Sequence, residues 1–234
     1  MTMTEFALYV KGRKTIVLPF GAIEAHGSHL PVDTDARIVG EVVKEVGLST
    51  GVLVAPVVPY GVCTSTGRHA GTISVTPPTL RAIATDIVTD AYSKGLRNFI
   101  LVSGHAGSIH VCALREAAET LVRTLEGVRM AVFSLYDIVP ASASEIIETA
   151  NDSHAGEAET SLIMRLAPHL LKGEGAEEFP KLPKLFVVKD KTRYWPGAVW
   201  GDPRMATKEK GDALFRLMVE KLSEVVVTIE TTDL

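Results

Sequence analysis

The sequence predicts an α/β fold, with a mostly parallel β-sheet covered by helices on both faces, in a single domain over residues 1–234. Short apolar runs rich in β-branched and aromatic residues alternate with longer segments of helical periodicity. The 234 residues, 46% of them hydrophobic, suit one large domain with a buried core. Gly47, Gly95 and Gly127 follow the first three helical segments and are predicted to end those helices before the next strand.

The predicted strands are apolar runs as short as a typical buried strand. They are Thr15–Pro19, Val52–Val58, Phe99–Ser103 and Arg129–Ser134, with Leu185–Lys189 as a less strongly patterned fifth. The predicted helices are Ala36–Val46, Thr79–Lys94, Ile109–Leu125, Ala158–Leu166 and Thr207–Glu224. Strands separated by single helices predict right-handed parallel crossovers. The less regular residues 172–211 are expected to lie over the active site or against a neighbouring subunit.

Composition excludes several classes of protein. Lys+Arg number 24 against 28 Asp+Glu, and no basic run appears, so nucleic-acid binding is not expected. No stretch of about 18 apolar residues and no signal-peptide pattern occur, so we expect no membrane partner. Cys63 and Cys112 are predicted to be reduced, buried thiols of a cytoplasmic protein.

Polar residues follow the predicted strands at their carboxyl ends, where the ligands of parallel sheets bind. Glu24 and His26 follow the first strand, His69 the second and His105 the third, while Asp35 lies at the start of a helix. In an extended chain Glu24 and His26 share one face. Mixed imidazole and carboxylate ligands suit Zn, Mn or Fe(II). Two such ions about 3.5–4 Å apart share and activate a water, so the pattern predicts a two-metal hydrolytic site.

Four segments resemble the creatininase superfamily of metal-dependent amidohydrolases. LPFGAIEAHGSHLPVDTD is similar to the opening motif of that family, SGHAGS to its Gly-His-Gly-Gly-Asn segment, HAGEAETSLIM to its third motif and WGDPRMATKEKG to a late segment. The likeness extends over about residues 15–215. The resemblance implies a three-layer sandwich, a binuclear metal centre and hydrolysis of a non-peptide or unusual amide C–N bond.

The resemblance also implies roles for individual residues. Four would bind the two divalent ions, Fe(II), Zn or Mn: Glu24, His26, Asp35 and His105. Asp35 would bridge the ions, and His154 would steady the tetrahedral intermediate or protonate the leaving nitrogen. Glu159, or in second place Glu157, would hold the substrate or relay a proton. The family further implies a homo-oligomer, from dimer to hexamer.

The chain departs from the family pattern at three places. A glutamate expected two residues after His105 is Gly107, which leaves the fifth ligand open between Glu157, Glu159 and water. A regular helix separates the two glutamates by about 200°, so they are not expected to share one role. The family's Phe-Pro-Gly-Thr segment reads His69-Ala70-Gly71-Thr72, and no creatinine-type tryptophan precedes His154. Creatinine is therefore not the expected substrate.

Several alternatives stay open at this point. The favoured activity is deformylation of a formylamino-pyrimidine ribose phosphate, an activity of the family. Other readings are peptide trimming of the mycofactocin type, creatinine hydrolysis, and a silent metal-binding assembly protein suggested by Gly107. Cations for the phosphate would come from Arg37, Arg68, Lys191 and Arg193, and further substrate contacts from His69 and Trp200. Trp195 and Trp200 could stack on a ring-shaped substrate or pack in the core. His29 could orient a metal ligand or be purely structural.

Overall fold

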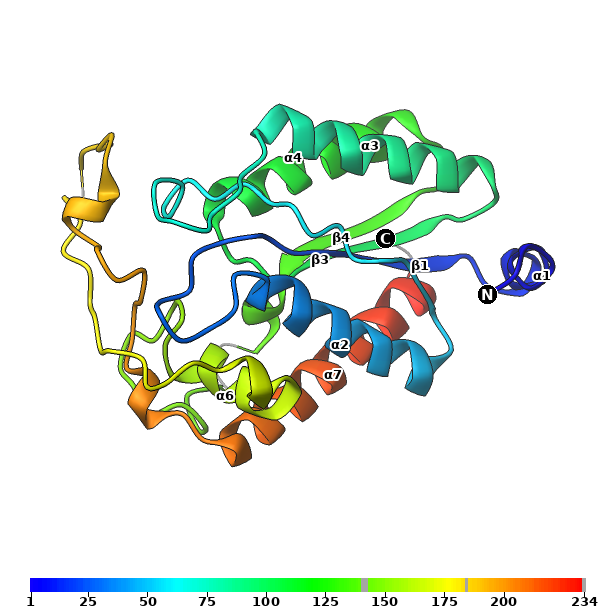
Figure 1. The fold of residues 1–234 in the computed structure, drawn as a ribbon. Coiled ribbons are helices and arrows are strands. Elements are labelled where there is room, and N and C mark those ends of the chain that lie inside the picture. The colour runs from blue at the N-terminus through cyan, green and yellow to red at the C-terminus, as the bar shows by residue number, and fades with distance from the viewer. Residues whose placement is uncertain (140–142, 184, 233–234) are drawn as a thin grey trace.

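Among the residues that the computed structural model describes, 1–139, 143–183 and 185–232, four parallel strands form the central layer (Figure 1). They are β1 (Thr15–Phe20), β2 (Leu53–Val54), β3 (Asn98–Ser103) and β4 (Arg129–Ser134), in the order β2-β1-β3-β4. β1 pairs with β2 and β3, and β3 pairs with β4, all in parallel. The predicted parallel α/β sheet is therefore confirmed.

Helices cover both faces of this sheet (Figure 1). One face is covered by α3 (Pro77–Ser93) and α4 (Ser108–Thr124). The other is covered by α2 (Thr34–Thr50), α6 (Glu157–Leu166) and α7 (Lys208–Thr231). None of the helices in the described ranges is long and apolar enough to span a membrane.

Strand alternation divides the buried side chains into two cores. Ile16, Leu18 and Phe20 of β1 pack with α3 and α4, whereas Val17 packs with α2, α6 and α7. Successive side chains of a strand point to opposite faces. Because both faces of the sheet are buried, its strands are continuous apolar runs rather than alternating ones. This is why short apolar runs located the sheet in the sequence.

Helix boundaries follow local capping chemistry. Thr76 caps α3 by accepting a hydrogen bond from the backbone N–H of Thr79 (3.3 Å), so α3 begins before its predicted start. The prediction that Gly47 ends α2 is wrong, because the helix continues to Thr50. It ends at Gly51, whose φ of 71° is the left-handed conformation that glycine adopts without a steric penalty.

Three further elements differ from the prediction. Helix α1 (Met3–Gly12) was not predicted, although Thr2 and Glu5 form a capping box that signals its start. The predicted strand at 52–58 forms a ladder only at Leu53–Val54. Leu185–Lys189 is not a strand: the segment has no ladder partner, and the side chains of Leu185, Phe186 and Val187 are exposed. Without a packing partner, an apolar run has no reason to become a strand.

Short 3₁₀ turns punctuate the rest of the chain. They are η1 (Leu135–Ile138), η2 (Pro168–Leu170), η3 (Lys191–Arg193) and η4 (Pro203–Met205). The irregular segment that contains η3 extends away from the helices at the carboxyl ends of the strands (Figure 1, yellow to orange). Both cysteines are free thiols, but only Cys63 is buried as predicted, whereas Cys112 is exposed.

Candidate metal centre

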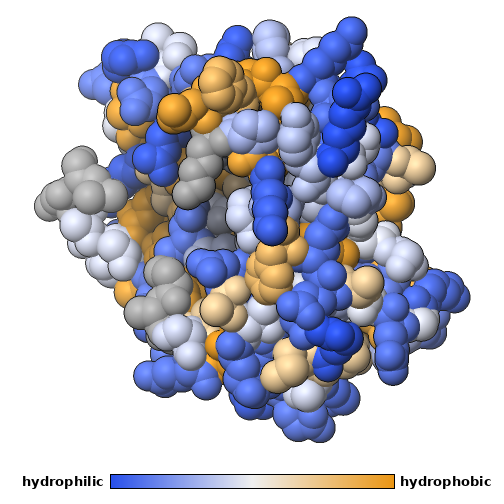
Figure 2. Space-filling model, turned by 90° about the vertical axis from the view of Figure 1, so that its left-hand side faces the viewer, coloured by the Kyte–Doolittle hydropathy of each residue, from blue (hydrophilic) through white to orange (hydrophobic). Residues whose placement is uncertain are grey.

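A cavity of about 260 Å³ lies beyond the carboxyl ends of the strands. Figure 2 shows this face of the molecule, which is hollowed and bordered by hydrophilic and hydrophobic residues alike. Six of the predicted site residues line the cavity: Glu24, Asp35, His105, His154, Glu159 and Trp200. These six residues come from the loops after the strands, from two helices and from irregular segments, and they are up to 176 positions apart in sequence, from Glu24 to Trp200.

Asp35 lies between the two buried histidines. Its Oδ1 is 3.2 Å from Nε2 of His26, and its Oδ2 is 3.2 Å from Nδ1 of His105. Glu24 Oε2 is 2.8 Å from the same His105 nitrogen, and Glu159 Oε2 is 3.5 Å from His26 Nε2. The donor atoms therefore form two groups, Glu24–Asp35–His105 and His26–Asp35–Glu159, which share Asp35.

Three atoms of this cluster have a neighbour within it at ion-pair distance but lack the hydrogen bonds that buried polar groups normally make. Glu24 Oε2, His26 Nε2 and Asp35 Oδ2 are buried and make no hydrogen bond. Ligand atoms that lie about 2.0–2.2 Å from a shared ion are themselves roughly 3 Å apart, which is the spacing seen here. Carboxylate and imidazole donors also suit Zn, Mn and Fe(II). The residues present fit two divalent cations with Asp35 between them.

The electrostatics of the cluster favour positive charge at its centre. Burial opposes protonation of His26, but the charges of Asp35 and Glu159 outweigh it and raise the pKa of His26 to about 10. Burial likewise opposes ionisation of Glu24, and His105 outweighs it, holding the pKa of Glu24 at about 2. The pKa of Asp35 is lowered in the same way, against burial, by His26 and His105. Cations that bind here would replace these protons.

Backbone carbonyls fix the orientation of both histidine rings. His26 Nδ1 donates to the carbonyl of Glu24 (3.0 Å), and His105 Nε2 donates to that of Val62 (3.2 Å). Because a carbonyl only accepts, the opposite nitrogen of each ring is the one left for a metal.

Thr66 is a site residue that the sequence did not reveal. Its buried hydroxyl donates to Glu24 Oε1 and leaves Oε2 facing His105. No motif or spacing distinguishes this threonine from its neighbours, so only the fold could identify it. We expect Thr66→Val to weaken metal binding by about 10–100-fold, the usual effect of losing an orienting partner. A metal titration would measure this, with Thr66→Ser as the hydroxyl-retaining control, and unchanged affinity in Thr66→Val would contradict it.

His154 and the two tryptophans form the wall above the cluster. The His154 ring lies 4.2 Å from the His26 ring, and its Nε2 donates to the carbonyl of Ala25 (2.8 Å). The backbone of His154 pairs with that of Trp200 in an antiparallel bridge. His69, in contrast, donates through Nε2 to the carbonyl of Trp195 (2.5 Å). It therefore holds the backbone at Trp195 and does not line the cavity.

Three other predicted or considered residues lie outside the donor groups. The Glu157 carboxylate accepts from the backbone N–H of Thr149 (2.7 Å) and is 2.5 Å from Lys210 Nζ. Arg68 is exposed and is not among the residues that line the cavity. His29 is buried and hydrogen-bonded through Nε2 to the Thr160 hydroxyl (3.0 Å), which favours its structural role.

His110 supports the turn that carries His105. Its Nδ1 accepts from the backbone N–H of Val62 (3.1 Å), so Nε2 carries the proton and donates to Ser103 (3.1 Å). The Ser103 hydroxyl in turn donates to the carbonyl of His105 (2.8 Å). Burial and the neighbouring His105 lower the pKa of His110 to about 3. Protonation of Nδ1 would place its N–H against the backbone N–H of Val62, so that two donors would face each other.

This neutral histidine makes stability depend on pH. The unfolded chain protonates His110 near pH 6.5, whereas the folded chain resists until about pH 3. Stability is therefore lost as pH falls below 6.5, by about 2 kcal/mol at pH 5. We expect the difference in unfolding free energy between the parent and His110→Gln to shrink by that amount from pH 7.5 to pH 5, measured by urea unfolding. An equal difference at both pH values would contradict it.

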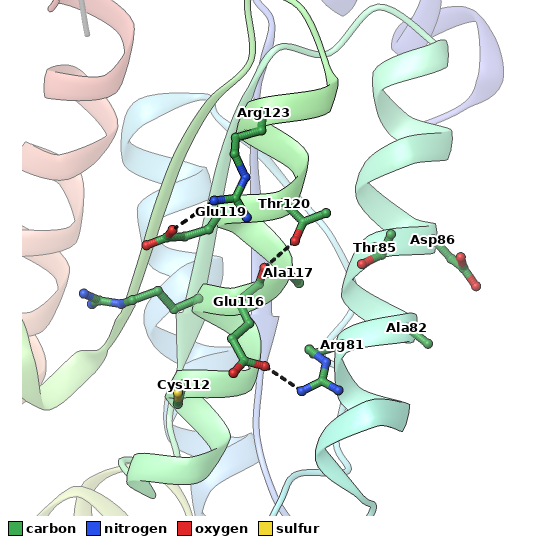
Figure 3. Close-up of a pocket in the computed structure, with 11 residues that line it drawn as sticks. Arg81, Ala82, Thr85, Asp86, Cys112, Glu116, Ala117, Glu119, Thr120 and Arg123 are labelled. Atoms are coloured by element: carbon green, nitrogen blue, oxygen red, sulfur yellow. Dashed lines mark hydrogen bonds and ion pairs between the residues drawn. The ribbon is translucent and has the colours of Figure 1, made fainter.

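A larger hollow of about 810 Å³ lies between α3 and α4 (Figure 3). Exposed ion pairs line it, Arg81–Glu116 at 2.5 Å and Arg123–Glu119 at 3.9 Å. Solvated pairs of this kind contribute little energy and perturb no reactive group. The smaller cavity, with its buried donors that lack hydrogen-bond partners, is therefore the candidate functional site.

Known proteins resemble this chain along most of its length. The family described as Creatininase, creatinine amidohydrolase, matches residues 1–226. The mycofactocin precursor peptide peptidase of Mycolicibacterium smegmatis is 32% identical over 219 residues, covering 87% of this chain and 81% of that protein. The creatinine amidohydrolase of Pseudomonas putida is 27% identical over 248 residues, covering 97% of this chain and 94% of that protein.

Solved structures of creatininases share the fold of this chain. A crystal structure of creatinine amidohydrolase gives a TM-score of 0.88 at 24% identity, covering 100% of this chain and 97% of its own. A Zn–Zn form and a manganese form of creatininase, each 25% identical with the same coverage, give TM-scores of 0.86 and 0.84. Relatives with this architecture thus carry zinc or manganese.

Proposed function

Because the chain belongs to the creatininase family of metal-dependent amidohydrolases, we propose that it hydrolyses an amide bond at the end of a short, acyclic peptide. The observation that carries the amidohydrolase chemistry is the set of buried atoms without a hydrogen-bond partner: Glu24 Oε2 and Asp35 Oδ2, whose residues line the cavity, and His26 Nε2 beside them. Such atoms are costly unless a cation binds them.

We assign the two ions to the donor groups that share Asp35. Glu159 would take the ligand position left vacant by Gly107, because its Oε2 is 3.5 Å from His26 Nε2. Its carboxylate is held by the Tyr136 hydroxyl (3.1 Å) and the backbone N–H of Ala155 (2.6 Å). When bound, the ions would supply a water of lowered pKa and polarise the scissile carbonyl.

The remaining lining residues have tasks that their positions suggest. His154, next to His26 and on the wall of the cavity, would pass a proton to the leaving nitrogen. Trp195 and Trp200 meet edge to face, with ring centroids 6.1 Å apart, and would exclude water above the substrate. Gly107 leaves room beside His105, since a Cβ there would lie 2.3 Å from its Nε2. A larger residue would need the ring or the turn to shift.

The charge of the cavity favours a peptide over a ribose phosphate. No lysine or arginine is among the described residues that line it, so an internal phosphate anchor has no support. The relatives named as peptide peptidases, 30–32% identical, point the same way. Arg37, a further candidate, is ion-paired with Asp33 (2.7 Å).

The deformylase remains the second candidate because the rim is basic. Lys191 Nζ donates to Ser65 Oγ (3.3 Å), and Ser65 lines the cavity. Arg193 Nε lies 4.0 Å from Asp190 Oδ2, and the pKa of Asp190 is lowered first by a hydrogen bond from Thr192 and then by the charges of Arg68 and Arg193. A carboxylate or a phosphate could approach through this rim.

A substrate panel tests the proposal. The protein, loaded in turn with Zn, Mn and Fe(II), is offered short peptides, a formylamino-pyrimidine with and without ribose phosphate, and creatinine. We expect release of a terminal residue from peptides. Preference for the phosphorylated formamide would instead favour deformylation, and bound metal with no hydrolysis of any amide would favour the silent assembly protein. Light scattering of the same samples would test the expected homo-oligomer.

A further inference from the structure

Cys63 lies within the metal centre, although sequence and family pattern gave it no role. Its Sγ, a carboxylate oxygen of Glu24 and a ring nitrogen of His105 all lie within 4.8 Å of one another. The thiol is buried, with 2% of the residue exposed. The only other cysteine, Cys112, is exposed on α4 and lines the hollow of Figure 3.

We propose that Cys63 is a thiolate ligand of the ion on the Glu24–His105 side, so that the two metal positions differ in chemistry. One position would have sulfur, nitrogen and oxygen donors, and the other, His26–Asp35–Glu159, only nitrogen and oxygen. The proposal rests on the two-metal centre of the proposed function. On binding, the S–H bond breaks, its proton leaves to solvent and a sulfur–metal bond forms, with no change of oxidation state.

A second feature, besides the grouping of Cys63 with Glu24 and His105, points to a cation. Glu24 Oε2 and Asp35 Oδ2 are buried on the same side of the centre and have no hydrogen-bond partner. A neutral thiol is a weak donor and would leave these carboxylate oxygens unsatisfied. A cation held by Cys63, Glu24 and His105 would satisfy the unpartnered Glu24 oxygen and the sulfur together.

The loop that carries Cys63 is built around the same metal position. The backbone N–H of Cys63 donates to Ser74 Oγ (2.9 Å), which holds the start of the loop. The preceding carbonyl, of Val62, accepts from His105, and Thr66 three residues later donates to Glu24. One short segment therefore orients two of the ligands and brings a sulfur atom to the same place.

The chemical consequence is a difference in metal preference. Thiolates favour Zn, Co(II) and Fe(II) over Mn, whereas carboxylate and imidazole accept all of them. The Cys63 position should therefore take the softer ion from a mixture. The His26–Asp35–Glu159 position should discriminate less.

Cobalt(II) provides a test that does not depend on activity. In a Cys112→Ser background, where Cys63 is the only thiol, two equivalents of cobalt should produce the near-ultraviolet charge-transfer band of a thiolate–cobalt bond. Cys63→Ser in the same background should lose that band while its visible cobalt bands and folded circular dichroism persist. Bound zinc should also protect Cys63 from alkylation in the unmutated pocket.

Metal competition gives the size of the effect. Cys63→Ser removes the sulfur ligand and should lower the preference for Zn over Mn at the Glu24–His105 position. The decrease should be at least roughly 10–100-fold, which is what the loss of an orienting partner costs. Cys63→Ala serves as a second variant without a hydroxyl. Binding of two cobalt ions without the charge-transfer band would overturn only the assignment of Cys63 as a ligand. No cobalt binding at all would overturn the metal centre itself.

Discussion

Replacing Asp35 with asparagine should remove at least one bound ion and lower turnover by more than about 100-fold, since even an orienting partner of a ligand is worth 10–100-fold. Asp35 Oδ1 faces His26 and its Oδ2 faces His105, each at 3.2 Å. Asparagine offers one oxygen, no charge and an NH₂ group that points a donor at a metal position. The two donor groups would lose the oxygen that joins them.

Asp33→Asn is the matched control for this change. Asp33 lies two residues earlier, is half-buried and pairs with Arg37 outside the cavity. We expect this variant to keep both ions and its turnover. Metal analysis of the purified proteins, combined with hydrolysis of the best substrate from the panel, measures both quantities. Two tightly bound ions in Asp35→Asn would refute the bridging role.

Glu159→Gln should lose metal, whereas Glu157→Gln should lose stability, although the two residues are only two positions apart. Glu159 faces His26, so its variant should lose metal from that group and lower turnover by roughly 100-fold or more while remaining folded. Glu157 instead holds the backbone at Thr149 and pairs with Lys210. Its variant should keep metal but lose about 1.5–3 kcal/mol of stability, the range for hydrogen bonds to a charged group.

The pH dependence separates the two roles further. Burial raises the pKa of Glu157, but Lys210 and the backbone donors outweigh it and lower the pKa below 4.5. Its contribution to stability is therefore present above pH 4.5 and is lost as pH falls below that value. Urea unfolding at pH 7 and pH 4 should show the stability difference of Glu157→Gln narrowing. Metal loss in Glu157→Gln, with metal retained in Glu159→Gln, would reverse the assignment.

Sequence alone could determine the layers of the fold and most of the donor set. Buried parallel strands are apolar on both faces, so β1, β3 and β4 were visible as short runs. Because parallel strands end at one edge, Glu24, His26 and His105 could be expected to meet there. The apolar run at Leu185–Lys189 misled for the same reason: its composition resembles that of a strand, but the fold provides nothing to pair with it.

Only the tertiary structure could decide which side chains reach the centre. Spacing along α6 shows that Glu157 and Glu159 diverge, but not which one faces His26, because that depends on how the helix packs. Thr66 and Cys63 belong to a loop without a recognisable pattern, and their contacts with Glu24 and His105 span about 40 residues. The periodicity of a sequence predicts which residues are buried. Which distant polar atoms come into contact depends on how the helices, strands and loops pack together.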